Sequence, residues 1–354
     1  MSVDTLTHAL SGALIARATH PRKITEHTLP IERRMLVGAA AAAFPDLDFV
    51  TSYITPLAYL YHHRGVTHSL LMLPLWAALV AIILAAIWKF RPRWRAYLGV
   101  AAIGIATHIA GDLITSFGTM IFAPVSDARY ALSATFIIDL WFTGIILTGL
   151  LATWGWRRSR AAAIAASVVL VGYVGFQWLM QQQAIAFGRD YAMRAGINAI
   201  KVTAMPRPVS PFNWTVFVED GERYHYAHIN LVRTRVLPQP DEDTGFIARL
   251  NAPYRPVSEA QWLSASLYGS TPDERSLVRD AYAQPDFRFF RWFAEYPSVF
   301  KIELGNPSAC VWFHDLRFMT PGRVATPFRY GMCRESDGEW QPFQWVGDER
   351  RPVY

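Results

Sequence analysis

One stretch of this chain restricts its possible folds more than any other: residues 69–88 are 20 consecutive positions without a charged side chain. A helix needs about 20 apolar residues to cross the hydrocarbon core of a bilayer, so this stretch predicts a transmembrane helix. Three further apolar stretches have similar length, at 97–122, 135–156 and 161–180. Together they predict a polytopic α-helical membrane domain with about four spans.

Two shorter apolar stretches, at 6–18 and 35–44, precede the four predicted spans. Each is too short to cross a bilayer comfortably, so we expect two short helices that are tilted or partly inserted. The charge density changes after residue 180, because residues 1–180 hold 22 of the 62 charged side chains and the remaining 174 residues hold 40. We therefore expect a membrane domain at 1–180 and a more polar domain at 181–354.

The second domain has the short alternating runs of polar and aromatic residues that are typical of strands, which predicts a small, strand-rich α+β domain. Residues 213–218 and 223–232 predict a hairpin, with Asp220 and Gly221 in its turn. Further strands are predicted at residues 287–296, 299–304, 311–318 and 328–333.

The second domain also contains a helix signal and both cysteines of the chain. Thr271 is followed by Pro272 and Glu274, the pattern of a capping box, so we expect a helix to begin there. Cys310 and Cys333 could form a disulfide in an oxidising compartment, and two unpaired buried thiols fit the sequence equally well.

The distribution of positive charge predicts the orientation of the spans. The formal net charge of +6 lies entirely in residues 1–180, which carry 14 Lys and Arg against 8 Asp and Glu. Two basic loops, at 89–95 and 157–160, are separated by two predicted spans, so both belong on the cytoplasmic side. By alternation, the loop at 123–134 and the domain at 181–354 are extracytoplasmic. Since the positive-inside rule explains the basic surplus, we expect no nucleic-acid partner.

Seven of the ten histidines lie in the membrane domain, where ionisable groups are costly and mark functional sites. Five of them, together with four aspartates and one arginine from nearby in the sequence, make up four clusters. Two of these are His and Asp pairs at i and i+4, which share one face of a helix. The clusters are Asp4 with His8, Asp46 with Asp48, His62, His63, Arg64 and His68 together, and His108 with Asp112.

The predicted topology brings these clusters to one level near the outer face. From Tyr97 at the cytoplasmic end, His108 lies about 16 Å along the helix axis and Asp112 about 22 Å. Mixed imidazole and carboxylate ligands suit a divalent ion, with zinc expected first and manganese or iron as alternatives, and their number allows two ions. The expected metal ligands are His8, Asp46, Asp48, His63, His68, His108 and Asp112, with His62 as a bystander.

Three residues are candidates for catalytic roles beside the metal. Asp48 and Asp139 could act as general acid or base, because a carboxylate without full metal ligation can carry a proton. Asp139 could instead pair with Arg64 or Arg129. Arg64 could hold a substrate oxygen bidentately, or serve as a counter-ion to the acidic cluster. A threonine precedes three of the histidines, at Thr7, Thr67 and Thr107, which suggests supporting hydrogen bonds around the ligands.

The four motifs, in this order over residues 1–180, resemble the signature of the YdjM-type inner-membrane metal-dependent hydrolases, a family also described as LexA-binding. The resemblance implies a multi-pass protein of a bacterial or archaeal cytoplasmic membrane, and a regulator protein as a partner. The motif order is also similar to the front half of the zinc-dependent phospholipase C and P1 nuclease group. The second His and the His-x-x-x-Glu ligands of that group have no counterpart here, which argues against a trinuclear zinc site. Asp139 could replace one of the missing ligands.

We therefore predict a membrane-bound hydrolase in which metal-activated water attacks an ester, with a phosphoester of a lipid or envelope-derived small molecule as the expected substrate. Two other classes of function fit the same residues. A divalent-cation transporter would also place His and Asp inside the membrane. A non-catalytic membrane scaffold that binds a regulator would agree with the LexA-related description of the resembling family.

Overall fold

The computed structural model describes residues 3–25, 28–88, 94–156, 159–241, 243–305, 308–323, 326–334, 338–347 and 349–354, without the side chains of residues 3 and 4. The chain forms two compact units. Unit 1 comprises Met1–Thr51 and His62–Trp178, and unit 2 comprises Ser52–Tyr61 and Leu179–Tyr354. The expected boundary at residue 180 lies next to the observed one. The sequence did not indicate that Ser52–Tyr61 groups with the C-terminal part.

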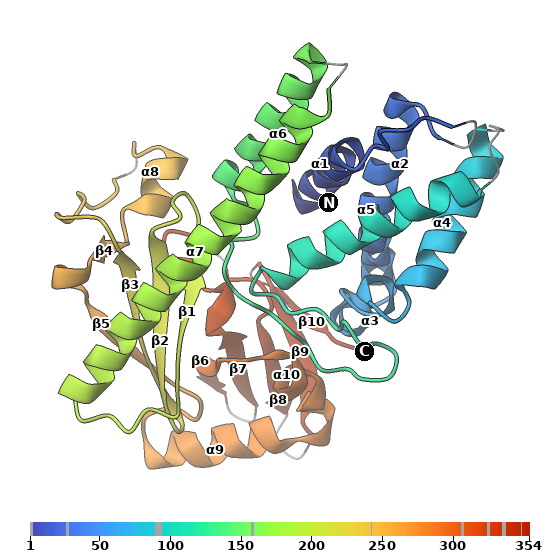
Figure 1. Cartoon of the computed structure of the whole chain (residues 1–354). Helices are drawn as coiled ribbons and strands as arrows, with labels where there is room; N and C mark the ends of the chain where they lie inside the picture. The colour runs from blue at the N-terminus through green and yellow to red at the C-terminus, as the bar shows by residue number, and fades with distance from the viewer. Residues whose placement is uncertain are drawn as a thin grey trace. The chain divides into compact units, whose positions relative to one another are not determined.

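The N-terminal half of the chain is helical, as its apolar stretches predict (Figure 1). Two short helices come first and longer apolar helices follow. The final one continues as a single helix across the boundary between the units. The elements are α1 (Val3–Ala18), α2 (Ile31–Ala43), η1 (Pro45–Tyr53), α3 (Pro56–His62), η2 (Val66–His68), α4 (Leu73–Trp88), α5 (Arg95–Leu113), α6 (Leu140–Gly155) and α7 (Ala161–Arg194).

Two of these helices, α5 and α7, are each long and apolar enough to cross a membrane. Two bent pairs would raise the number of candidate spans to four: α2 with η1, bent by 41°, and Pro56–His68 with α4, bent by 83°. Helix α6 is apolar but shorter. The basic loops that oriented the predicted spans lie mostly outside the described residues, at 89–93 and 157–158.

Two predicted spans are shorter in the structure than in the sequence pattern. The stretch at 97–122 stops being helical at Leu113, and the chain then turns through Gly118, whose φ of +91° favours glycine. The stretch at 135–156 becomes helical only at Leu140, because Asp139 caps the helix by accepting hydrogen bonds from the backbone N–H groups of residues 141 and 142. Both differences arise from local backbone chemistry rather than from hydrophobicity.

Helices α1, α2 and α5 approach one another through three glycines. A Cβ atom on Gly12 would lie 2.2 Å from the carbonyl oxygen of Gly38, and one on Gly104 would lie 2.8 Å from that same oxygen. Such contacts are impossible for any residue larger than glycine, and small residues of this kind let membrane helices pack backbone to backbone. Each glycine lies four residues, or about one turn, from a position of the candidate site: His8, Ala42 and His108.

The C-terminal half contains two five-stranded sheets (Figure 1). In the first sheet the order is β1-β2-β3-β4, with β5 also paired to β3, and in the second it is β10-β9-β8-β7-β6. The first sheet uses β1 (Lys201–Pro206), β2 (Asn213–Asp220), β3 (Arg223–Asn230), β4 (Arg255–Pro256) and β5 (Trp262–Ser266). The second uses β6 (Pro297–Leu304), β7 (Ala309–Asp315), β8 (Tyr330–Arg334), β9 (Gln341–Val346) and β10 (Glu349–Pro352).

The predicted hairpin is confirmed as β2 and β3, with a small shift of its turn. Asp220 pairs with Arg223, so the two loop residues are Gly221 and Glu222, one position later than expected. Gly221 has a φ of +60°, the left-handed conformation that this tight turn needs. The short elements between the strands are α8 (Phe246–Asn251), η3 (Val257–Glu259), α9 (Pro272–Ala283), η4 (Pro285–Phe287), α10 (Arg288–Phe293) and η5 (Leu316–Phe318).

The helix predicted at Thr271 is confirmed as α9, which begins with a complete capping box. The strand predicted at 287–296 is wrong, because this segment forms η4 and α10. Phe287, Phe290 and Phe293 are buried at a spacing of three, which suits a helical turn, whereas a strand would place alternate residues on one face. A short aromatic run does not distinguish the two patterns in the sequence.

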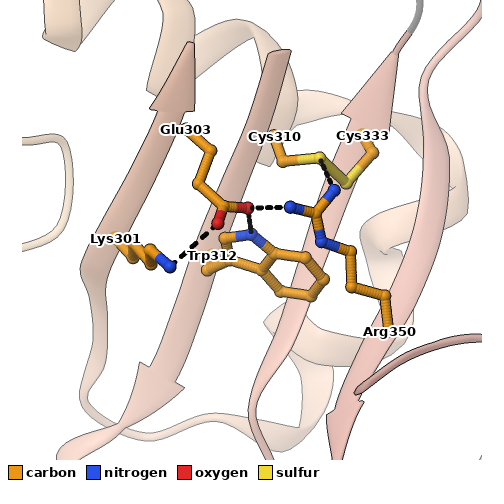
Figure 2. Close-up of a disulfide and its surroundings, with 6 residues drawn as sticks. All are labelled: Lys301, Glu303, Cys310, Trp312, Cys333 and Arg350. Atoms are coloured by element: carbon orange, nitrogen blue, oxygen red, sulfur yellow. Dashed lines mark hydrogen bonds and ion pairs between the residues drawn. A yellow bond between two sulfur atoms is a disulfide. The ribbon is translucent and has the colours of Figure 1, made fainter. Parts of the chain in front are cut away.

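Cys310 and Cys333 form a disulfide, which resolves the two alternatives that the sequence left open. They are directly opposite each other on β7 and β8. Figure 2 shows the polar contacts beside the bond: Glu303 accepts a hydrogen bond from Trp312 Nε1 and pairs with Arg350 at 2.8 Å. The disulfide therefore joins two neighbouring strands inside the second sheet.

The glycine contact between α1, α2 and α5 gives a first prediction. We expect Gly38→Val to destabilise the detergent-purified protein by about 1–3 kcal/mol or more, because the new side chain meets backbone atoms that cannot move aside. Gly99→Val is the matched control, since a Cβ atom at Gly99 in α5 meets no atom within 4 Å. Thermal unfolding of both variants measures the difference, and equal melting temperatures would contradict the packing described.

Candidate metal centre

The centre of the site is a buried contact between two histidines and one aspartate. His68 Nε2 lies 2.9 Å from His108 Nε2 and 3.1 Å from Asp112 Oδ2, and His108 Nε2 lies 3.5 Å from the same carboxylate oxygen. All three side chains are fully shielded from solvent. His108 and Asp112 share one face of α5, and η2 brings His68 to them.

The hydrogen bonds on the other side of each ring define which nitrogen faces the centre. His108 Nδ1 lies 2.6 Å from the carbonyl oxygen of Ala42, which can only accept, so the ring donates there and, when neutral, directs an Nε2 lone pair to the centre. His68 Nδ1 contacts Thr67 Oγ1 at 2.9 Å, and that hydroxyl donates to Asp48 Oδ2. His68 therefore also donates from Nδ1 and directs an Nε2 lone pair inward.

These lone pairs need a cation between them. Two unprotonated nitrogens and a carboxylate oxygen at such short distances repel one another in a buried site, unless a proton or a metal ion lies among them. Ligands of a tetrahedral zinc ion with bonds of about 2.0–2.1 Å lie about 3.3 Å apart. The three observed separations surround this value, so the arrangement fits a divalent ion without rearrangement.

Asp46 supplies a further carboxylate to the same group. Its Oδ1 atom lies 3.7 Å from His108 Nε2 and 3.9 Å from His68 Nε2. Its Oδ2 atom is buried and receives no hydrogen bond within the part of the chain that the structure describes. A buried oxygen of this kind is costly without a positive partner, which also fits a bound ion. The donor set of nitrogen and carboxylate oxygen suits zinc, manganese or iron.

His8 reaches the centre from the opposite side of Asp112. His8 Nε2 lies 3.2 Å from Asp112 Oδ1, and the His8 ring stacks on His108 with a centroid distance of 3.9 Å. Two sets of three ligand atoms could each hold an ion: His8 with Asp46 and His108, and His68 with His108 and Asp112. Both sets include His108, whose Nδ1 is bonded to Ala42 and whose Nε2 can bind one ion, so the two sets are alternative positions for a single ion.

Asp48 and His63, which the sequence suggested as ligands, lie one hydrogen bond away from this centre. Asp48 contacts His63 Nδ1 at 2.9 Å and the backbone N–H of Arg64 at 3.0 Å, and it accepts the hydroxyl hydrogen bond from Thr67. This carboxylate therefore organises the loop that carries His68. Neither Asp48 nor His63 belongs to the two ligand sets formed by the described residues.

Arg64 is the counter-ion of Asp112. Its Nη2 atom lies 2.9 Å from Asp112 Oδ1, and its Nη1 atom donates to Thr115 Oγ1 at 2.7 Å. Of the two roles considered from the sequence, this contact favours the counter-ion over the substrate clamp. Arg64 also has a φ of +59°, an unusual conformation for a residue other than glycine, and such strain concentrates at functional sites.

The remaining predicted residues lie elsewhere. Asp139 is the N-cap of α6, and its oxygens also accept hydrogen bonds from Tyr173 and Gln177 of α7. The structure therefore does not bring Asp139 to the centre as a replacement ligand, and its partners are not the arginines considered from the sequence. The side chain of His62 is exposed and lies outside both ligand sets, and the side chain of Asp4 is outside the described residues.

Two supporting groups were missed in the sequence. Thr115 donates to the Asp112 carbonyl oxygen and accepts from Arg64, and its position three residues after Asp112 was the available signal. No sequence pattern could have identified the carbonyl oxygen of Ala42, because every residue has a backbone carbonyl group. Of the three threonines that precede histidines, Thr67 supports a ligand, whereas Thr107 donates to the carbonyl oxygen of Ile103 in its own helix.

The geometry predicts how metal content responds to substitution. We expect detergent-purified protein to bind zinc, manganese or iron, and His108→Ala with Asp112→Ala to lose the metal, because it removes two ligands that converge on one point. His62→Ala is the matched control and should keep it. Asp48→Asn should weaken metal affinity by about 10–100-fold, because it loosens His68 without removing a ligand.

Elemental analysis and chelator competition measure these outcomes. A folded wild-type protein that binds none of the three metals after reconstitution would show that a proton, and not an ion, stabilises the centre.

The site residues all lie in the part of the chain that resembles known proteins. A sequence profile described as YdjM inner membrane protein matches residues 3–184. The uncharacterized protein YfhP of Bacillus subtilis (strain 168) is 25% identical over 183 residues, which cover 51% of this chain and 55% of that protein. The chain thus spans about half the length of this relative. No solved structure matches the chain.

The profile covers more than half of the chain, and its description names a membrane and no reaction. The resemblance noted from the four motifs is confirmed at the level of the family. The chain belongs to the YdjM inner membrane protein family.

Proposed function

We propose that this protein is a membrane-embedded, metal-dependent hydrolase that cleaves an ester, with a phosphoester of a lipid or envelope-derived molecule as the substrate class. One observation carries the proposal: the Nε2 atoms of two histidines and the carboxylates of two aspartates converge in a buried site with ligand spacing. Mixed histidine and carboxylate sets are typical of catalytic metal sites, which keep a position open for water or substrate.

A divalent ion held by these residues would lower the pKa of water and polarise an ester oxygen at neutral pH. The residues of the chain would hold the ion and position its ligands. Asp46 Oδ1 faces the Nε2 atoms of His68 and His108, so this carboxylate would complete the ligand set for the ion. Asp48 is instead a positioning residue, because its oxygens are committed to the loop around His68.

Arg64 contributes to the proposed chemistry through Asp112. Its guanidinium offsets the negative charge of Asp112 on the Oδ1 side, which leaves Oδ2 directed at the two histidines. The burial of this pair makes the arrangement rigid, because separating either charge from its partner is costly. A rigid ligand set favours catalysis over transport, in which ions must enter and leave freely.

The hydrolase proposal predicts metal-dependent turnover. Protein in nanodiscs, loaded separately with zinc, manganese or iron, should hydrolyse members of a panel of phosphomonoesters and phosphodiesters that includes lipid phosphates. Chelation and His108→Ala should reduce the rate to the metal-free level, because both remove the ion, and His62→Ala should not.

A loaded protein that hydrolyses no member of the panel but carries metal into proteoliposomes would support transport instead. Capture of a regulator protein by metal-free and metal-loaded protein alike, without either activity, would support the scaffold.

We also propose that the C-terminal unit lies outside the cytoplasm. Two observations support an extracytoplasmic position. The basic loops at 89–95 and 157–160 favour the cytoplasmic side, which by alternation of the spans puts the C-terminal unit on the other side. The Cys310–Cys333 disulfide also suits an oxidising compartment. The site would then lie near the outer face.

This orientation predicts that protease added to intact spheroplasts will remove residues 181–354. It also predicts that Cys310 and Cys333 resist alkylation unless first reduced. Protection from protease in intact spheroplasts, with digestion only after lysis, would place the unit in the cytosol.

A further inference from the structure

Within unit 1, a cavity of about 350 Å³ lies between α1, α5, α6 and α7. We propose that it holds one hydrocarbon chain of a lipid whose head group reaches the candidate metal centre. This inference rests on the proposed function and deepens it, because it assigns the substrate class: an amphiphile with a single apolar tail in the cavity. The volume is in the range of about 300–1,000 Å³ that small-molecule sites occupy.

The chemistry of the wall favours an apolar occupant. Ile15, Ile114, Phe142, Leu170 and Val174 contribute apolar surface from all four helices. Several hydroxyl groups also line the cavity, but they already donate hydrogen bonds within the protein. These are Ser11 to the carbonyl oxygen of Thr7, Thr107 to that of Ile103, Thr115 to that of Asp112, Ser167 to that of Ala163, and Thr135 to Gln177 Oε1.

The two ionisable residues in the wall have different roles. Asp139 accepts from two backbone N–H groups, from Tyr173 and from Gln177, so its carboxylate is already saturated. The two other hydroxyls of the wall, on Thr7 and Thr143, contact each other at 3.4 Å. A buried water needs about two to four polar partners, and a wall whose polar groups mostly have protein partners offers few of them. The cavity is therefore poorly suited to water or a polar ligand, and well suited to methylene groups.

His8 connects the cavity to the metal centre. It lines the cavity and also lies in a ligand set with Asp46 and His108. Gly111, in the same wall, leaves the space for the His8 ring, since a Cβ atom there would lie 2.8 Å from the ring carbon Cε1. From His8 the wall continues along α1 to Ile15, seven residues or about 10 Å further. A tail placed along this wall has its polar end at the ligands.

The cavity is accessible from the side of the helix bundle. Val171 lines it and is 74% exposed, and it lies on α7, a candidate membrane span. In a member of an inner membrane protein family, the molecules beside such an opening are lipids. An ion held by His8, Asp46 and His108 would add positive charge at this end of the cavity, which favours an anionic lipid such as a phosphate ester.

The test uses the full chain in nanodiscs that contain a phosphatidic acid with a photoactivatable diazirine in the middle of one acyl chain. We expect irradiation to label the lining residues of α1 and α7, which are Ser11, Ile15, Ser167, Leu170, Val171 and Val174. Val174→Trp should reduce this labelling by about tenfold, because the indole fills the cavity. Val168→Trp, on the same helix but 66% exposed and outside the cavity wall, should leave it unchanged.

Competition identifies the part of the lipid that binds. Dodecyl phosphate should displace the labelled lipid, whereas inorganic phosphate at equal concentration should not, because it has no tail. Labelling that is no stronger than on the exposed face of α4, or that is insensitive to Val174→Trp, would overturn the inference.

The two proposals fail separately. Specific labelling in a protein that binds no metal would reject the hydrolase and keep the lipid site. Turnover of a soluble phosphoester without cavity labelling would keep the hydrolase and reject the lipid site.

Discussion

The contact of three glycines between α1, α2 and α5 determines where the polar residues of this helical unit can meet. Because Gly12, Gly38 and Gly104 allow the backbones to touch, the positions one turn away on each helix are also close. Those positions carry His8, the carbonyl oxygen of Ala42 and His108, which respectively stack, accept and donate within the centre. Helix packing and ligand geometry are thus consequences of the same three residues.

The sequence predicted the composition of the site better than its internal order. The i and i+4 spacing of His108 and Asp112, and the density of histidines at 62–68, indicated where polar residues converge, but of the three histidines at 62–68 only His68 belongs to a candidate ligand set of the described residues. Spacing along the chain cannot distinguish a metal ligand from a residue that positions that ligand by a hydrogen bond, because both lie within a few ångströms of the metal centre. Asp46 and Asp48 are the example: they are two residues apart, yet Asp46 faces both histidines and Asp48 faces the loop.

The fold was predictable where a long-range pattern decides the structure, and less so where a local contact does. Runs of apolar residues located the helices, while their ends depended on Asp139 as a cap and on the conformation of Gly118. In the C-terminal unit, turn and capping residues located β2, β3 and α9. Side-chain burial decided α10, because Phe289, Phe290 and Phe293 of this helix pack into a core that the sequence alone does not reveal.

Ser52–Tyr61 belongs to unit 2, although it lies between Asp48 and His63 in the chain. Tyr61, for example, packs against Trp292 with a ring-centroid distance of 5.2 Å. The polypeptide therefore leaves the ligand-bearing unit after Asp48, contributes ten residues to the C-terminal unit, and returns just before His63. The region shared with the family ends near residue 184, yet this segment within it has its packing partners beyond that point. In this chain a segment of the family region is thus part of the C-terminal compact unit, so the end of the family match is not the only place where the chain passes between the units.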